Sequence, residues 1–185
     1  MEALLGIFLG IGLSAACGFR VFVPFLVVSI TKMTGHLDVV PGFDWVGTWP
    51  ALIAFACATG LEILAYYIPV IDNALDTVAT PAAAVAGVVA TMSAVGDMSP
   101  LLEWALGLIG AGVASSVQLS TATLRLTSTG VTAGLGNPIV ATSELAGSVA
   151  TSVVSIIFPV VAAILVVAGA VCVALVFKKK LLART

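Results

Sequence analysis

The chain of 185 residues carries very little charge. Lys, Arg, Asp and Glu make up 9% of it, whereas a soluble globular domain carries roughly 25%. Because 61% of the residues are hydrophobic and the mean hydropathy is +1.22, the chain cannot cover itself with a surface that water solvates. A soluble domain is therefore excluded, and the lipid bilayer is the expected solvent and first partner.

The sequence also lacks the marks of several functional classes. Its net charge is −2 and its single basic run, "KKKLLAR", is at residues 178–184, so no nucleic-acid-binding surface is expected. The lone histidine, His36, has no cluster of metal ligands around it, and neither Gly-x-Ser-x-Gly nor His-Glu-x-x-His occurs. Cys17, Cys57 and Cys172 lie in apolar segments and suit packing. We therefore expect no metal, no cofactor and no enzymatic activity.

Long apolar runs fill most of the chain. Stretches such as "FPVVAAILVVAGAVCVALVF" do not alternate as barrel strands do, and they have the roughly 20 residues of a transmembrane helix. We expect an all-α, polytopic transmembrane bundle in a single domain, residues 1–185, with six spans. The fifth segment is the least apolar, so a re-entrant or interfacial helix there, with five full spans, is the alternative. The six apolar segments cover residues 3–30, 50–69, 74–95, 101–126, 138–157 and 158–177.

Basic and aromatic residues predict the orientation. The first segment lacks the basic n-region of a signal peptide, so we expect a retained helix. The basic tail after the last segment predicts a cytoplasmic C-terminus in a bacterial inner membrane. Six spans then place the N-terminus in the cytoplasm and the loop at residues 32–50 outside, whereas five spans exchange the two. The tail residues are Lys178, Lys179, Lys180 and Arg184. The aromatic residues expected at the interfaces are Trp45, Trp49 and Trp104 outside and Tyr66 and Tyr67 inside.

Short matching motifs in the same order indicate an internal duplication. Halves of three spans each, at about residues 1–97 and 98–180, would insert in opposite orientations, as in the inverted repeats of many secondary transporters. Chance similarity between helices rich in small residues is the alternative. The matches are "LGIGLSAAC" (9–17) with "IGAGVASSV" (109–117), and "CATGLE" (57–62) with "VATSEL" (140–145).

Four ionisable residues lie well inside apolar segments: Arg20, Glu62, Arg125 and Glu144. Each costs at least about 2.5–3.5 kcal/mol at mid-bilayer unless it is paired or faces water. Each half has one Arg in its first segment and one Glu in its second, so pairing within a half or across the halves is possible. The pairs are either structural salt bridges or part of a polar pathway.

Two further carboxylates follow the second segment. Asp72 and Asp76 are spaced i, i+4, which places both on one helix face. They are candidates to receive a cation, relay a proton or pair with an arginine. Alternatively, they are first-turn residues that the helix dipole favours.

The stretch "STATLRLTSTGVTAGLGNP" (120–138) is unusually polar and rich in glycine. Its glycines and the pair Asn137-Pro138 predict that helix unwinds between Arg125 and Pro138 and then restarts. "GFRVFVPF" (18–25) predicts a similar break in the first half. Broken helices at matching places indicate a membrane binding site, to which Thr127 would contribute a hydroxyl. The alternative is a short cytoplasmic loop.

These motifs resemble a bacterial group of small integral membrane proteins, catalogued as domain of unknown function four-one-two-six. The resemblance rests on "GFRVFVPF", "YYIPVIDNALDTVATPAAAVAG" and "STGVTAGLGNPIV" and covers nearly the whole chain. It implies a helical membrane fold but no particular activity. The positions that match the family pattern are Arg20, Pro24, Glu62, Pro69, Asp72, Asp76, Pro81, Arg125, Gly136, Asn137, Pro138 and Glu144.

The sequence thus predicts a small transporter or channel for an ion or a small polar or anionic solute. The alternative is a non-catalytic accessory subunit, assembly factor or lipid-binding scaffold, with a second copy or another membrane protein as partner. The residues predicted to line the substrate or ion pathway are Arg20, Glu62, Asp72, Asp76, Arg125, Thr127, Asn137 and Glu144.

Overall fold

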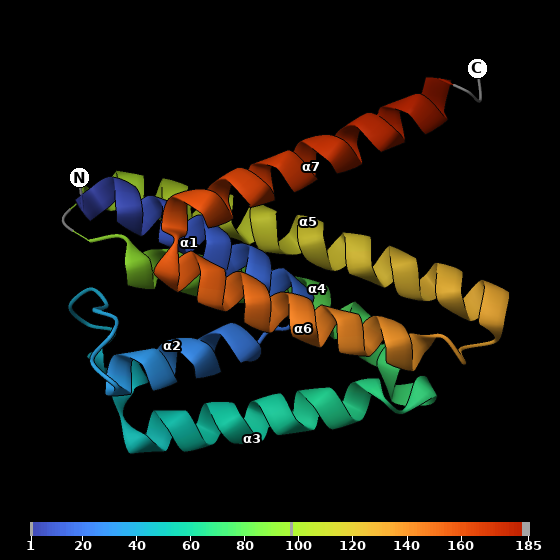
Figure 1. The fold of residues 1–185 in the computed structure, drawn as a ribbon, viewed down its shortest axis with the longest axis horizontal. Coiled ribbons are helices and arrows are strands. Elements are labelled where there is room, and N and C mark those ends of the chain that lie inside the picture. The colour runs from blue at the N-terminus through green and yellow to red at the C-terminus, as the bar shows by residue number, and fades with distance from the viewer. Residues whose placement is uncertain (1, 97, 183–185) are drawn as a thin grey trace.

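Every regular element in the described part of the computed structural model is helical (Figure 1). The structure describes residues 2–96 and 98–182, without the side chains of residues 2, 69, 70, 72, 73, 173, 174 and 176–182. The expected all-α class is therefore confirmed. The elements are α1 (Glu2–Phe19), α2 (Val23–Met33), the 3-10 helix η1 (Asp44–Gly47), α3 (Trp49–Tyr66), α4 (Pro69–Ala94), α5 (Pro100–Thr132), α6 (Asn137–Ile157) and α7 (Pro159–Leu182).

Prolines mark where six of these helices begin. At the first turn of a helix the missing proline N–H has no intrahelical acceptor to bond, and the fixed φ suits helix entry. Pro81 is different, because it lies inside α4, where it cannot donate to the carbonyl of Thr77. The six first-turn prolines are Pro24, Pro50, Pro69, Pro100, Pro138 and Pro159.

The first apolar segment, expected as one long span over residues 3–30, is instead a hairpin of two helices. α1 ends at Phe19, the chain reverses over residues 20–22, and α2 runs back (Figure 1). Pro24 gives the local reason, because its ring would clash with the carbonyl of Arg20 in a continuous helix. The predicted break in the first half is therefore present, but it turns the chain around.

Both ends of this hairpin lie at the same end of the bundle. Gly6, near the start of α1, packs against the backbone carbonyl of Ala94 at the end of α4. Val40, in the loop after α2, donates its N–H to the carbonyl of Ser93 at 3.2 Å. The expectation that the N-terminus and the loop at residues 32–50 lie on opposite sides is therefore wrong for both span models.

Counted over the described residues, four helices are long and apolar enough to cross a membrane: α3, α4 over Ala74–Ala94, α5 and α6. The chain alternates in direction from α3 to α6, whereas α7 diverges from the bundle (Figure 1). Six full spans are not confirmed within the described residues, because α1 and α2 enter and leave at one end. The protein is thus a multi-pass helical membrane protein with a hairpin inserted beside its spans.

The three tryptophans gather at the end of the bundle where the hairpin opens. Trp45 lies in η1, and Trp49 and Trp104 lie in the first turns of α3 and α5, which start at that end (Figure 1). All three are more than half exposed, at 51%, 68% and 59%. This grouping is typical of an aromatic belt at a membrane interface.

Small residues bring the central helices into close contact. A Cβ atom added at Gly87 of α4 would lie 2.5 Å from the carbonyl oxygen of Gly110 of α5. Beside this crossing, Ser14 of α1 donates to the carbonyl of Gly87 at 2.9 Å, and its hydroxyl lies 2.8 Å from that of Thr91. In lipid, close backbone packing and interhelical hydrogen bonds hold helices together, because the hydrophobic effect does not drive helices against one another there. α1, α4 and α5 therefore form the packed centre.

The connection between α5 and α6 differs from the break at residues 20–22. α5 stays helical past Arg125 to Thr132, and only residues 133–136 form a turn, where Ala133 and Gly134 have φ of 52° and 87°. This turn lies at the end of the bundle opposite the tryptophans (Figure 1). The unwinding expected from Arg125 onward is therefore confined to a tight turn. The matching broken helices of an inverted repeat are not confirmed.

Candidate functional site

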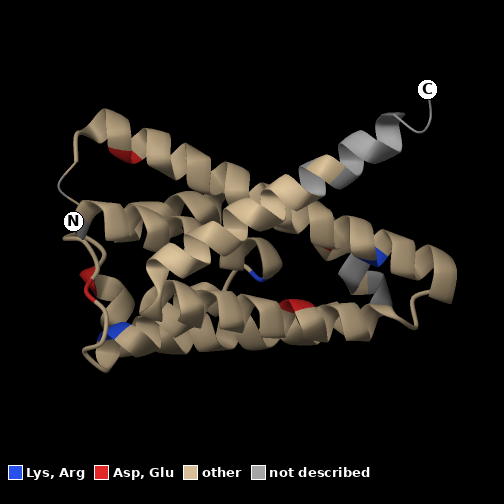
Figure 2. Ribbon diagram, turned by 45° about the horizontal axis from the view of Figure 1, so that its top comes forward, with Lys and Arg blue, Asp and Glu red and all other residues tan. Residues whose placement is uncertain are grey.

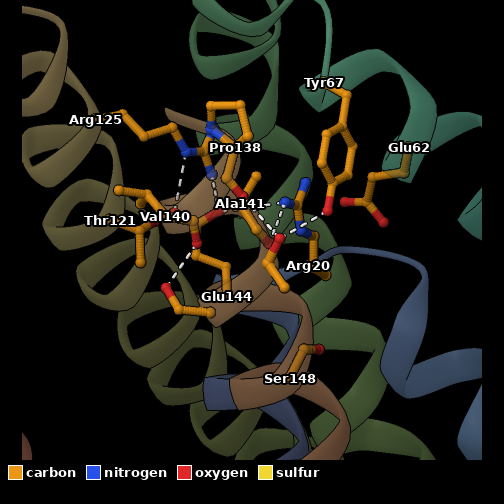
Figure 3. Close-up of polar contacts among 12 residues, drawn as sticks. Arg20, Glu62, Tyr67, Thr121, Arg125, Pro138, Val140, Ala141, Glu144 and Ser148 are labelled. Carbon is orange, nitrogen blue, oxygen red and sulfur yellow. Dashed lines mark hydrogen bonds and ion pairs between the residues drawn. The ribbon is translucent and has the colours of Figure 1, made fainter. Parts of the chain in front are cut away.

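Five ionisable side chains from five segments meet beside the tip of the α1–α2 hairpin. Figure 3 labels four of them, Arg20, Glu62, Arg125 and Glu144. Figure 2 shows that most of the described ribbon carries no charged residue. Arg20, Arg125 and Glu144 are buried, with exposed fractions of 2%, 1% and 3%. We call these five residues the charged cluster: Arg20 from the hairpin tip, Glu62 from α3, Asp76 from α4, Arg125 from α5 and Glu144 from α6.

Arg125 makes the most contacts in the charged cluster. Its Nε donates to Oε1 of Glu144 at 3.0 Å, and its Nη2 forms a second, short contact to Oε2. Its Nη1 donates to Oδ1 of Asp76 at 2.6 Å. A side-on pair with two parallel N–H···O bonds is among the strongest polar contacts a protein makes. Arg125 therefore joins α4, α5 and α6.

Arg20 pairs across the two proposed halves. Its Nη2 donates to the carbonyl of Ala141 at 2.9 Å and lies 3.4 Å from Oε2 of Glu144. Glu144 thus bridges both arginines, which was one of the alternatives that the sequence left open. Within the described part of the chain, Nε and Nη1 of Arg20 have no hydrogen-bond acceptor. Buried donors without acceptors are costly, so the arrangement leaves part of the hydrogen-bonding capacity of Arg20 unused.

Glu62 holds the hairpin tip through the backbone. Its Oε1 accepts the N–H of Val21 at 2.8 Å, and its Oε2 accepts the N–H of Phe22 at 3.2 Å. These N–H groups stand at the start of α2, where no carbonyl of the preceding turn can receive them. Glu62 therefore caps α2 from α3, and a carboxylate there also suits the dipole of α2.

Tyr66 fills the space next to the two arginines. The guanidinium carbons of Arg20 and Arg125 lie 3.8 and 4.1 Å from its ring centroid. This side chain is 3% exposed, so it packs inside the protein at the end of α3 and does not face lipid or water. Tyr67, beside it, is 44% exposed, and its hydroxyl lies 2.7 Å from that of Thr142. Stacking on an aromatic face stabilises a desolvated cation by about 2 kcal/mol or more.

The charged cluster carries two guanidinium groups and three carboxylates. With all five ionised, one negative charge remains unbalanced. A proton or another cation would neutralise it, whereas a free anion would have to displace a carboxylate from an arginine. Among the described side chains, no group of three His, Cys, Asp or Glu is placed to hold a metal ion.

The remaining predicted pathway residues lie outside the charged cluster. Thr127 is exposed on α5, and its hydroxyl donates to the carbonyl of Thr123 at 2.8 Å. Asn137 is 2% exposed at the start of α6, where its Nδ2 donates to Oγ1 of Thr129 at 3.0 Å. It therefore stabilises the turn between α5 and α6. The side chain of Asp72 lies outside the described residues.

Two groups of the site were not predicted from the sequence. Tyr66 lies one helical turn after Glu62, and this i, i+4 spacing on α3 was the signal that could have identified it. The carbonyl of Ala141 had no such signal, because every residue has a backbone carbonyl and the residue type does not show which one accepts a hydrogen bond. Its role depends on where α6 passes the hairpin tip.

The comparison with known proteins identifies the family of the chain. The family model described as Domain of unknown function (DUF4126) matches residues 7–179, which is most of the chain. No curated protein matches the chain, and no solved structure matches it. The residues of the charged cluster all fall within the matched range. The chain therefore belongs to the DUF4126 family, as the sequence motifs had predicted.

Proposed function

We propose that the protein is a small transporter or channel-like protein for an ion or a small polar or anionic solute, with the charged cluster as its pathway. The convergence of five ionisable side chains in the bundle supports this proposal, because buried charges in membrane proteins are rare and usually functional. The non-helical backbone at residues 20–22 also supports it. Such backbone is tolerated at membrane depth where it is buried in protein or lines a cavity.

The chemistry of the charged cluster favours a particular coupling. Its unbalanced negative charge favours uptake of a proton or a cation. The two open N–H donors of Arg20 favour a solute that presents an oxygen atom. A proton taken up by Asp76 or Glu144 would make the cluster neutral and weaken the hold of that carboxyl on a guanidinium edge, which could then bind the solute.

The remaining parts of the proposal rest on the sequence. The basic tail favours a bacterial inner membrane with a cytoplasmic C-terminus; Arg184 and the side chains of Lys178, Lys179 and Lys180 lie outside the described residues. The three-plus-three inverted repeat is supported by the matched motifs alone. The lack of hydrolase and metalloenzyme motifs favours a function without catalysis.

A second candidate function is a non-catalytic scaffold or accessory subunit. The pairing within the charged cluster favours it, because Glu62, Arg125 and Glu144 each bind protein groups from another segment. In that case the cluster holds the hairpin and the bundle together. The protein would then be isolated from native membranes with one stoichiometric partner.

Flux measurements in proteoliposomes test the first proposal. We expect the wild-type protein to carry protons, seen with a trapped pH dye, or a small inorganic ion, seen with an ion-selective electrode. Glu144→Gln and Arg20→Ala should abolish the flux, because each removes a charge from the pathway. Leu61→Ala and Thr127→Ala should leave it unchanged, since Leu61 is 68% exposed and Thr127 faces outward.

Two results would contradict the transport proposal. One is a wild-type protein that is correctly folded and inserted yet carries neither protons nor the inorganic ions tested. The other is flux that persists unchanged in both cluster variants. Either result, combined with recovery of one stoichiometric companion, would favour the scaffold.

A further inference from the structure

A lateral groove lies between α2, α3 and α4, closed at one end by η1. Its volume is about 590 Å³, and its lining is apolar apart from Ser93. The hydroxyl of Ser93 already donates to the carbonyl of Ala90 at 2.9 Å, so it does not need a partner in the groove. The groove is therefore suited to an apolar occupant.

The wall opposite α4 is made of packed aromatic rings. Phe25 of α2 and Phe55 of α3 stack with ring centroids 5.6 Å apart, and Trp45 of η1 lies 5.9 Å from Phe55. The α4 wall includes the small side chains of Ala82 and Ala86. Because the rings lie on one side and small side chains on the other, the groove between the helices stays open.

The groove is long enough to hold an acyl chain over the full depth of one lipid leaflet. Its lining on α4 extends from Val78 to Ser93, which is about 22 Å at 1.5 Å per residue. This exceeds half of the hydrocarbon core, which is about 30 Å thick. Val78 and Val85 are 63% and 64% exposed, so the groove opens sideways onto the surface that contacts lipid.

We propose that this groove binds one acyl chain of a bilayer phospholipid. The headgroup lies at the tryptophan end of the bundle, where Trp45 lines the groove, and the end of the chain reaches Phe22 at the hairpin tip. The occupant is a hydrocarbon chain because the groove is continuous with the lipid-facing surface of α4. The site lies outside the charged cluster and does not depend on the transport proposal.

Phe22 connects the two sites. Its side chain lines the inner end of the groove, and its backbone N–H donates to Glu62. A bound acyl chain therefore packs against the same residues whose backbone Glu62 caps. Lipid occupancy stabilises the hairpin tip in the position that the charged cluster requires.

Photo-crosslinking tests this inference. The full chain is reconstituted into bilayers that contain a few mole per cent of phosphatidylcholine with a diazirine at mid-chain, and crosslinked peptides are mapped by mass spectrometry. We expect labelling at Phe55 and Val85 several-fold above labelling at Leu119, which is 55% exposed on the outward side of α5. Excess unlabelled phosphatidylcholine should compete with the probe for the groove, so that only the labelling of the groove residues behaves as saturable binding.

Two variants make the test independent of one mutant's folding. Ala82→Phe and Val85→Phe each add bulk to the groove, and Val85 is exposed enough for the change to leave the interior intact. Each should remove the excess labelling at Phe55, whereas Leu119→Phe should not. Equal labelling of the groove and α5 would overturn the proposal. Labelling by a diazirine fatty acid but not by the phospholipid would also overturn it.

Discussion

Arg125 of α5 holds Glu144 of α6 side-on, with its Nε 3.0 Å from Oε1 and its Nη2 in contact with Oε2. The pair lies two helical turns inside the bundle from the turn that joins the two helices. The same arginine reaches Asp76 of α4, and the same glutamate reaches Arg20 at the hairpin tip. One pair of side chains therefore connects α4, α5, α6 and the hairpin tip.

Breaking this pair should destabilise the protein strongly. Arg125→Ala removes the cation that Asp76 and Glu144 share, and Glu144→Ala removes the anion that the two arginines share. Removing one partner of a buried pair costs about 3–5 kcal/mol. We expect losses of that size in the free energy of unfolding, measured by denaturant titration in mixed micelles.

The double variant Arg125→Met/Glu144→Leu is the control for this pair. It replaces both charges by apolar side chains, so its loss should be well below the sum of the single losses. Strictly additive losses would show that the two side chains do not interact in the membrane.

Glu62 should matter through the backbone that it caps. Glu62→Ala removes the acceptor for the N–H groups of Val21 and Phe22, and loss of a helix cap costs about 0.5–2 kcal/mol. Glu62→Gln keeps one carbonyl acceptor and should lose less. Hydrogen exchange of the amides of Val21 and Phe22 should accelerate in the alanine variant and stay slow in Leu61→Ala. Unchanged exchange in Glu62→Ala would contradict the capping role.

The ring of Tyr66 should stabilise the two arginines. Tyr66→Leu removes the aromatic face from Arg20 and Arg125, and we expect a loss of about 2 kcal/mol in the free energy of unfolding. Tyr66→Phe keeps the ring and should lose clearly less. Tyr67→Leu is the matched control, because its side chain is exposed and has no cation over its ring in the described structure. Equal losses for Tyr66→Phe and Tyr66→Leu would show that the ring face contributes nothing.

A methyl group added at the crossing of Gly87 and Gly110 should lower the stability of the protein. Gly87→Ala places Cβ 2.5 Å from the carbonyl of Gly110, so the helices must move apart. Overpacking of this kind costs about 1–3 kcal/mol. Gly112→Ala, two residues along α5, meets nothing within 4 Å and should be neutral or stabilising by up to about 1 kcal/mol. Thermal melting in one detergent would compare them, and equal melting temperatures would refute the close crossing.

The surface pair of Lys32 and Asp44 should give a small pH dependence. Lys32 donates to Asp44 at 2.9 Å, and this hydrogen bond lowers the pKa of the Asp44 carboxyl below its ordinary value. A lowered pKa in the folded state means that the pair stabilises the fold above the ordinary pKa, about 3.9, and that this is lost as the pH falls through the lowered value. The melting temperatures of wild type and Asp44→Asn should therefore differ slightly at neutral pH and converge in acid.

Several features of the structure could be predicted from local sequence alone. The low charge and the long apolar runs determined the membrane environment, because no other solvent accepts such a surface. First-turn prolines marked the starts of six helices, since proline conformation is local. The charges of Arg20, Glu62, Arg125 and Glu144 were visible as costly residues in apolar segments, and they do lie together.

The direction of the chain after Arg20 could not be predicted in the same way. Pro24 predicts a break, but whether the helix continues across the membrane or turns back depends on which helices pack beside it. Glu62, which is 40 residues further along the chain, caps the returning helix. The expected six spans are therefore not confirmed, and the difference arises at a place where a distant residue decides the geometry.

The sequence by itself determined that this protein is a helical membrane protein with a few buried charges, because hydropathy and proline act locally. Only the tertiary structure decided the partners of those charges. It paired Arg20 with Glu144, assigned Glu62 to a backbone cap and placed Tyr66 beside two arginines. These choices depend on how helices pass one another in space, and that in turn depends on small residues such as Gly87 and Gly110, which let the backbones approach.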